Sequence, residues 1–411
     1  MVETIHTVIV GGGQAGLSLS YHLQQRGIEH VVFEKAAQAG EAWRNHRWDS
    51  FTLVTPNWSF CLPGAEYREG DPDGFMPRVE IVERFEHYVD HFHLPVQYQT
   101  QVTSVEPLDG DSGYLVQTQD KKVRARNVVI ATGLYQADKV PVFASGIPMG
   151  IKQLPSSQYR NPESLPPGAV LVVGSAQSGG QIAEELQQSG RTVYLCVGSA
   201  GHVPRRYRGR DIYDWLNRSG FIDRTEAALP SPKMKFAGNP LLSGKNGGHA
   251  LNLHRFARDG IVLLGRLQDV QNGKIRLATD LKENLAKVDK FQAEALKMVD
   301  TYIEKNALDA PTEHLPELRD GYDVEIIEQL DLKSAGINTV VWTTGYAFDF
   351  RMIKLPVLDA DGFPIQKGGV TNYPGLSFIG LPWLPKQKTG QLIGVGEHAA
   401  AIASEIAGRG K

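Results

Sequence analysis

The chain has 411 residues, of which 41% are hydrophobic and 22% are charged, and its formal net charge is −3. These values are typical of a globular protein with room for two domains, and the negative net charge argues against a surface for nucleic acid. The only cysteines, Cys61 and Cys196, lie far apart, which excludes a C-x-x-C redox pair and a cysteine zinc site. No apolar run could span a bilayer and the N-terminus has no basic region, so we expect a cytoplasmic protein without membrane contact.

The first predicted elements are a strand, a glycine-rich turn, a helix and a second strand. Residues 5–10 form an apolar run typical of a buried strand, and a G-x-G-x-x-G motif follows. The motif consists of Gly11, Gly12, Gly13, Gln14, Ala15 and Gly16. Its first glycine allows a tight turn, the second lets the backbone approach a pyrophosphate, and the third lets the helix pack on the strand. The second strand ends at Glu34, whose carboxylate suits a ribose hydroxyl, so this stretch predicts a dinucleotide site.

A loop-rich stretch follows, in which Gly40, Trp43 and Asn57 stand out among aromatic residues and prolines. After it we expect a helix at 79–92, strands at 96–105 and 114–118 in a small antiparallel insertion, and a buried strand at 127–130. That last strand ends in Ala131, Thr132 and Gly133. A proline-rich segment, 141–167, then leads to the next domain.

The opening pattern occurs a second time. A strand at 170–173 precedes a turn made of Gly174, Ser175, Ala176, Gln177, Ser178 and Gly179, and a helix and a strand at 193–197 follow. The two copies are in register, because the step that leads from Gly11 to Glu34 leads from Gly174 to Val197. This internal repeat predicts an α/β protein with two Rossmann-like dinucleotide-binding domains.

The rest of the chain predicts an inserted second domain. We expect an irregular segment at 207–248, an amphipathic helix at 281–306, a buried strand at 338–342, a strand at 376–379 and a final helix from about Gln391. The turn Thr343, Thr344, Gly345, Tyr346 echoes residues 131–133 and marks a return between domains. We therefore predict a first domain of residues 1–160 and 336–411 and a second domain of residues 161–335.

Several motifs together resemble the class B flavin-dependent monooxygenases, which include the flavin-containing monooxygenases and the plant indole-3-pyruvate monooxygenases. The resemblance covers nearly the whole chain, and the order and spacing of the motifs carry it. The motifs are the two glycine-rich turns and residues 40–43, 131–133, 157–162 and 344–346.

The resemblance implies FAD in the first domain, NADPH in the second, and O2 as co-substrate. NADPH would reduce the flavin, O2 would form a C4a-(hydro)peroxyflavin, and one oxygen atom would pass to a small organic substrate at nitrogen, sulfur or a carbonyl carbon. It also implies that Gly40 and Trp43 flank the flavin and that Asn57 is a catalytic residue at its reactive face. The final helix would point its N-terminus at the flavin. We also expect the following residues to bind a cofactor: Lys35, Val102, Ala131, Thr132, Gly133, Thr344, Gly345, Tyr346, Gly380 and Gln391.

One position departs from the family pattern. The family fingerprint has a histidine four residues before its aromatic residue, and alignment on Tyr159 puts Pro155 there. That histidine is associated with coordination of the two domains, so its absence puts efficient coupling in doubt and disfavours the Baeyer–Villiger subtype. Two alternatives stay open: an NADPH-dependent flavin reductase that serves another acceptor, and a catalytically idle nucleotide-binding sensor. The sequence does not identify the substrate, and it is compatible with a homodimer.

The two copies also predict the choice of nicotinamide coenzyme. Val197 replaces the carboxylate of Glu34, so no acid there binds the ribose 2′-hydroxyl or repels a 2′-phosphate. Arg205 and Arg206 open a basic cluster nearby, and a guanidinium matches a phosphate with two charge-assisted hydrogen bonds. His202 adds charge there only when protonated. We therefore expect NADPH in preference to NADH.

Overall fold

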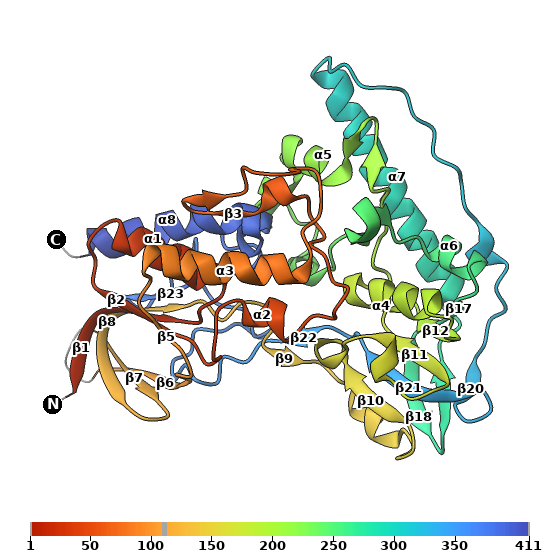
Figure 1. The fold of residues 1–411 in the computed structure, drawn as a ribbon, viewed down its shortest axis with the longest axis horizontal. Helices are drawn as coiled ribbons and strands as arrows, with labels where there is room; N and C mark the ends of the chain where they lie inside the picture. The colour runs from red at the N-terminus through yellow and green to blue at the C-terminus, as the bar shows by residue number, and fades with distance from the viewer. Residues whose placement is uncertain (1, 109–112, 410–411) are drawn as a thin grey trace.

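The computed structural model describes residues 2–108 and 113–409. It contains two sheets with parallel cores, which lie toward opposite ends of the molecule (Figure 1). Each sheet carries a glycine-rich turn and a following helix at the end of a central strand. The predicted α/β class with two dinucleotide-binding domains is therefore confirmed.

The first sheet has the strand order β5-β2-β1-β8-β7-β6, and β23 also pairs with β8. Its strands are β1 (Glu3–Val10), β2 (His30–Phe33), β5 (Val96–Gln97), β6 (Val102–Pro107), β7 (Tyr114–Thr118), β8 (Lys122–Ile130) and β23 (Leu376–Phe378). Because β1 is parallel to both β2 and β8 and all three end in register, Gly11, Glu34 and Ala131 meet at one edge.

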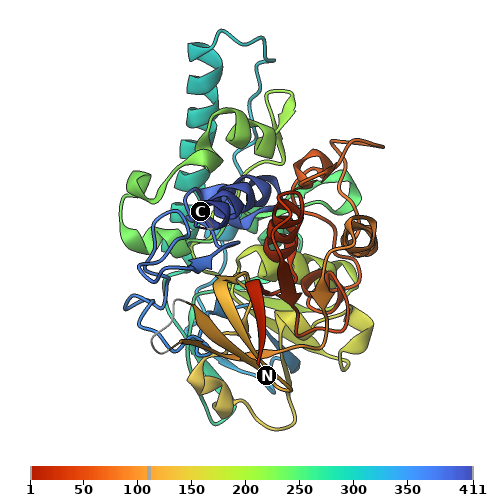
Figure 2. The same ribbon diagram turned by 90° about the vertical axis from the view of Figure 1, so that its left-hand side faces the viewer.

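Three helices pack around the first sheet, and each agrees with a predicted helix to within a few residues. They are α1 (Gln14–Gln24), α3 (Arg78–Phe92) and α8 (Leu392–Gly408). Figure 2 shows the C-terminal helix α8 beside α1, above the strands. The two ends of the chain therefore cover the same sheet, as the predicted return of the C-terminus to the first domain requires.

The second sheet is parallel throughout, with the order β10-β21-β11-β12-β17. Its strands are β10 (Lys152–Pro155), β21 (Ile337–Trp342), β11 (Ala169–Val173), β12 (Val193–Cys196) and β17 (Val262–Leu264). Helices α4 (Gln177–Gln188), α6 (Leu253–Arg258) and α7 (Leu281–Lys305) belong to this half, and β18 (Leu267–Gln271), β19 (Lys274–Leu277) and β20 (Gln329–Asp331) form a small antiparallel sheet.

The predicted domain boundaries need correction. Strands β10 and β21 lie in the second sheet, although residues 1–160 and 336–411 were assigned to the first domain. The proline-rich sequence around β10 looks like a linker, and only its pairing with β21 reveals the strand. The chain passes between the domains through a two-stranded ribbon of β9 (Ala137–Asp138) and β22 (Tyr346–Ala347). We propose that the inserted domain spans residues 139–345.

The segment predicted as irregular, 207–248, contains a helix and parts of two short hairpins. The helix is α5 (Ile212–Arg218), and the hairpins pair β13 (Arg206–Tyr207) with β14 (Arg210–Asp211) and β15 (Leu242–Ser243) with β16 (His249–Ala250). The remaining short elements include α2 (Glu41–Arg44), β3 (Cys61–Leu62) and β4 (Ala65–Glu66). Within residues 2–108 and 113–409, every helix is too short or too polar to cross a membrane.

The two domains share a packed interface. One buried apolar cluster runs from α1 and β1 through Trp48 and Tyr159 to β11 and α4. The Ser50 hydroxyl of the first domain also donates a hydrogen bond to the carboxylate of Glu185 on α4 of the inserted domain. Both nucleotide sites are therefore held in a fixed relation in this arrangement.

Candidate cofactor sites

The two glycine-rich turns have the same backbone geometry. Gly11 has φ of 108° and Gly174 has φ of 109°, a left-handed region that favours glycine. A Cβ on either residue would lie 2.7 Å from a carbonyl oxygen of the neighbouring strand end. At the third glycine of each motif, Gly16 or Gly179, a Cβ would lie 1.9 Å from the oxygen of the first glycine. Side chains are thus excluded where the helix packs on its strand.

The middle position of each motif is different, because it faces open space. A Cβ on Gly13 would have no neighbour within 4 Å. Ala176, the matching residue, has φ of −75° and ψ of −171°, against −80° and −173° for Gly13. Each is the N-cap of its helix, where free N–H groups and the helix dipole attract an anion. Both turns therefore fit the pyrophosphate of a dinucleotide.

Glu34 is fixed at the rim of the first turn. Its Oε2 accepts a hydrogen bond of 2.6 Å from Gly12 N–H, and its Oε1 accepts one of 2.8 Å from Ala36 N–H. A carboxylate has about four acceptor positions, so acceptor capacity is left for a ribose hydroxyl. Thr100 N–H donates to the Glu34 carbonyl at 2.8 Å, which brings the strand that starts at Val102 close to this residue. Lys35 is exposed beside it.

Residues from the C-terminal part of the chain complete the first site. Gln14 donates a hydrogen bond of 2.8 Å from Nε2 to the Gly390 carbonyl, next to Gln391 at the N-cap of α8. A Cβ on Gly380 would lie 2.4 Å from Cβ of Ala15, so this close approach to α1 requires glycine. Gly380, Gly390 and Gln391 thus lie beside the first glycine turn, and their contact with a cofactor stays a prediction.

The loop side of the first site contains an unpaired polar atom. Thr132 Oγ1 is buried and has no hydrogen-bond partner among the described residues. A buried polar atom without a hydrogen-bond partner destabilises the folded protein unless a ligand or a water molecule supplies that partner. The unpaired Thr132 hydroxyl beside the glycine turn therefore fits a cofactor that supplies its hydrogen-bond partner.

The predicted flavin-flanking residues Gly40 and Trp43 belong to the short helix α2. Gly40, with φ of 72°, is its N-cap, and the centre of the Trp43 ring lies 5.8 Å from that of Phe51.

The second site has its own local contacts. Ser175 Oγ accepts a hydrogen bond of 2.9 Å from Gly198 N–H, directly after Val197, while Gln177 binds the backbone of Leu242. Ser178 lies in the first turn of α4. Thr344 Oγ1 donates to the Lys139 carbonyl, and Tyr346 packs edge-on against Tyr135 at 4.9 Å. Residues 344–346 therefore hold the inter-domain ribbon and lie at the predicted crossing point.

A relative from Geobacillus kaustophilus, described as an uncharacterized CzcO-like oxidoreductase, is 30% identical over 99% of this chain and 99% of its own. The chain belongs to the CzcO-like oxidoreductases. The family model described as pyridine nucleotide-disulphide oxidoreductase matches residues 8–210. A probable indole-3-pyruvate monooxygenase from Arabidopsis thaliana is 28% identical over 50% of each chain.

Solved structures give the same fold for this CzcO-like chain. The flavin-containing monooxygenase from Stenotrophomonas maltophilia superposes with a TM-score of 0.68 over 100% of both chains, at 18% identity. These findings confirm the assignment as an oxidoreductase, and the plant relative and the structural neighbour agree with the predicted resemblance to the class B flavin-dependent monooxygenases. The predicted cofactors, FAD and NADPH, agree with that family.

The predicted phosphate-binding role of Arg205 in this oxidoreductase does not fit the structure. Its side chain is only 4% exposed. Nε and Nη2 each donate a hydrogen bond of 2.6 Å to the Asp211 carboxylate, and Nη1 donates to the Val54 carbonyl at 2.7 Å. All three nitrogens of the guanidinium therefore donate hydrogen bonds to partners within the chain. Arg206 is exposed and is left as the candidate for a 2′-phosphate.

Asn57, predicted as a catalytic residue, makes buried structural contacts. Its side chain is 5% exposed, and Oδ1 accepts a hydrogen bond of 2.7 Å from Met76 N–H. Its Nδ2 donates to the Asp71 carbonyl at 2.9 Å. The amide thus ties the turn 71–76 to the 3-10 helix Asn57–Ser59, and both of its polar atoms are used.

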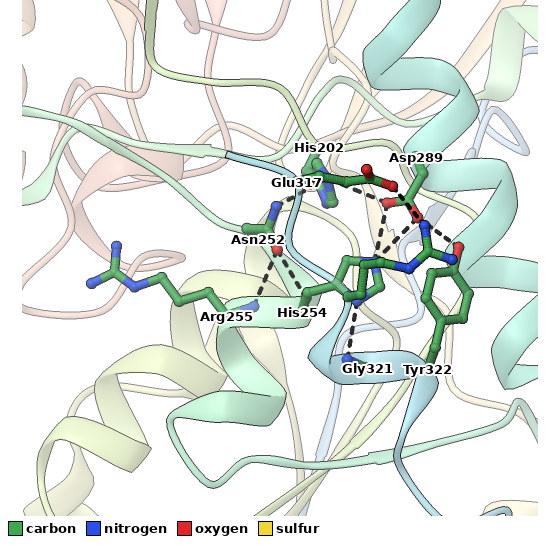
Figure 3. Close-up of polar contacts among 9 residues, drawn as sticks. His202, Asn252, His254, Arg255, Asp289, Glu317, Gly321 and Tyr322 are labelled. Carbon is green, nitrogen blue, oxygen red and sulfur yellow. Dashed lines mark hydrogen bonds and ion pairs between the residues drawn. The ribbon is translucent and has the colours of Figure 1, made fainter. Parts of the chain in front are cut away.

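His202 lies in a buried polar cluster and adds no positive charge at neutral pH. Figure 3 shows the cluster, in which His254 and Tyr322 both bind the carboxylate of Asp289. His202 accepts from Asn252 at 3.1 Å, and its Nδ1 has no partner among the described residues. Burial lowers the pKa of His202 to about 4, although the Asp289 carboxylate opposes this shift. The predicted contribution of His202 to a phosphate site therefore needs a protonated form that burial disfavours.

This histidine predicts a loss of stability in acid. Its pKa is about 4 in the folded protein and about 6.5 when exposed, so the unfolded chain binds the proton more readily. The stabilisation is present above pH 6.5 and is lost as the pH falls toward 4. We expect His202 to account for about 2 kcal/mol of lost unfolding free energy between pH 7 and pH 5. Urea unfolding of the wild type and of His202→Gln at both pH values measures this, and equal losses would contradict it.

Proposed function

We propose that the chain is an FAD-dependent, NADPH-driven monooxygenase that transfers one oxygen atom of O2 to a small organic substrate at nitrogen, sulfur or a carbonyl carbon. The proposal rests on one observation above all. Two glycine turns of matching geometry lie at strand ends in two sheets with parallel cores. The strand after the first turn leads into an acid, Glu34, whereas the matching residue after the second turn is Val197. That asymmetry favours two different dinucleotides in one chain. The cytoplasmic location is part of the same proposal.

Different residues of the chain would contact different parts of the bound FAD. The turn at Gly13 would hold the FAD pyrophosphate, Glu34 its ribose, and Thr132 Oγ1 would gain a hydrogen-bond partner. The N-terminus of α8 at Gln391 would put a partial positive charge beside the flavin, where negative charge develops on reduction. Bound FAD would accept hydride from NADPH and activate O2, while the protein orients the reactants and excludes water.

Rapid mixing separates this function from its alternatives. Purified protein should carry FAD, and anaerobic NADPH should bleach the flavin absorbance. When O2 is then added, a monooxygenase should reoxidise in two spectrally distinct stages, with little peroxide released while substrate is present. Single-stage reoxidation with full peroxide release would favour the flavin reductase, and unchanged absorbance with NADPH would favour the idle sensor.

The two thiols should take no part in flavin reduction. Burial raises the pKa of Cys196 to about 12, and burial also raises the pKa of Cys61, so both thiols stay protonated at neutral pH. They lie in different domains, on β12 and β3. The variant Cys61→Ser, Cys196→Ser should keep the wild-type rate of NADPH-driven bleaching in stopped-flow measurements. A selective loss of that rate in folded protein would contradict this and would indicate a disulfide reductase.

Arg206 should select NADPH over NADH. It is exposed, and Val197 presents no carboxylate to repel a 2′-phosphate. A charge-assisted contact to phosphate contributes about 1.5–3 kcal/mol, so Arg206→Ala should weaken NADPH by roughly one to two decades and leave NADH nearly unchanged. Flavin reduction rates against the concentration of each coenzyme measure this. Equal losses for both coenzymes would rule out the 2′-phosphate contact, and a wild-type preference for NADH would refute the assignment.

A further inference from the structure

A buried series of side chains crosses the interface between the two domains twice. It starts in the first domain, where the Val54 carbonyl accepts from Arg205 and the Phe75 ring centre lies 4.5 Å from the guanidinium carbon. Arg205 belongs to the inserted domain and binds Asp211 there through two hydrogen bonds. The series then continues along α5 and returns to the first domain at α8.

The second crossing is made by Tyr213. Asp211 is the N-cap of α5, and its Oδ1 accepts a hydrogen bond of 2.8 Å from Tyr213 N–H. The Tyr213 hydroxyl donates a hydrogen bond of 2.5 Å to Oε1 of Gln391, the N-cap of α8. Burial raises the pKa of Tyr213, so the phenol stays protonated and remains a donor. A rigid ring from the inserted domain therefore holds one end of the Gln391 amide.

The bond to Tyr213 also orients the rest of that amide. With Oε1 engaged, the two hydrogens of Gln391 Nε2 face away from Tyr213, and they bind no other described residue. The backbone beside them is fixed as well, because the Gly390 carbonyl accepts from Gln14 in the glycine turn. The Gln391 amide thus lies at the N-cap of α8, one residue after the carbonyl that Gln14 of the glycine turn contacts.

We infer that Arg205, Asp211 and Tyr213 are positioning residues, which orient the Gln391 amide toward the flavin only when the inserted domain is docked. The inference rests on the proposed function for its ligand. It gives Arg205 a role in place of the phosphate site. It also provides contact between the domains that is independent of position 155, where the family fingerprint histidine is absent.

Removal of one hydroxyl tests the inference. Tyr213→Phe keeps the ring, which packs against Trp58 at 5.7 Å, and deletes only the bond to Gln391. Tyr207→Phe is the matched control, because Tyr207 is also 6% exposed and its hydroxyl binds Asp300 at 3.0 Å, outside this series. In the FAD-loaded proteins we expect Tyr213→Phe to shift the flavin midpoint potential and to weaken FAD by up to about tenfold, whereas the control should do neither.

A double-mutant cycle shows whether the effect passes through Gln391. In a Gln391→Ala background, Tyr213→Phe should cause no further shift of the potential. An equal shift in both backgrounds, or equal effects of the two tyrosine variants, would overturn the inference. Amide hydrogen exchange in the first turn of α8, measured without FAD, should rise in Tyr213→Phe alone. This separates failure of the positioning series from failure of FAD binding, which would instead overturn the proposed function.

Discussion

Replacement of Gly13 by valine should give a folded protein that purifies without FAD. The chain itself has room for the side chain, since a Cβ on Gly13 has no neighbour within 4 Å, so the fold should survive. The same space would hold the FAD pyrophosphate, and two γ-methyl groups there would overlap it. Overpacking of this kind costs about 1–3 kcal/mol or more, which is roughly ten- to a hundredfold in affinity. Flavin absorbance per protein and circular dichroism measure the two parts of the result.

The internal repeat supplies a matched control for this variant. Ala176 occupies the corresponding position with nearly the same backbone angles, so Ala176→Val places the same methyl groups at the second turn. That variant should keep its FAD and bind NADPH more weakly. Full FAD occupancy in folded Gly13→Val would show that FAD does not lie at the first turn.

Arg205→Ala should destabilise the fold far more than Arg206→Ala. Arg205 and Asp211 form a buried ion pair with two hydrogen bonds, and truncation would leave the Asp211 carboxylate buried without its partner. Loss of one member of such a pair costs about 3–5 kcal/mol. Arg206 is exposed, so its truncation should change the unfolding free energy by less than about 0.5 kcal/mol.

Denaturant unfolding of the two variants, with and without NADPH, measures the difference. Arg205→Ala should lose stability in both conditions, because the ion pair does not depend on the coenzyme. A small and equal effect of the two substitutions in the absence of coenzyme would mean that the Arg205 pair is not formed in solution.

The sequence was most informative where function depends on local backbone geometry. The glycine turns could be predicted because a positive φ at Gly11 and close packing at Gly16 exclude other residues, whatever the rest of the fold. The N-terminus of α8 could be placed because Gln391 follows a glycine and precedes an apolar helical pattern.

Side-chain roles set by distant contacts could not be predicted. Arg205 lies in a run of basic residues. Its hydrogen bond to the carbonyl of Val54, 151 positions earlier, forms only because the two domains pack together. Asn57 similarly binds a turn whose shape the sequence does not specify. Strand β10 was missed because its partner, β21, comes almost two hundred residues later.

The ribbon of β9 and β22 has a consequence for how such a chain could arise. Tyr346 lies opposite Asp138, so the points where the inserted domain begins and ends are neighbours, about 5 Å apart. A second nucleotide-binding module could therefore enter the first through one short loop without moving any strand of the first sheet. Tandem duplication followed by insertion at that loop would produce this topology, and exchange of the module between relatives would need only two adjacent junctions.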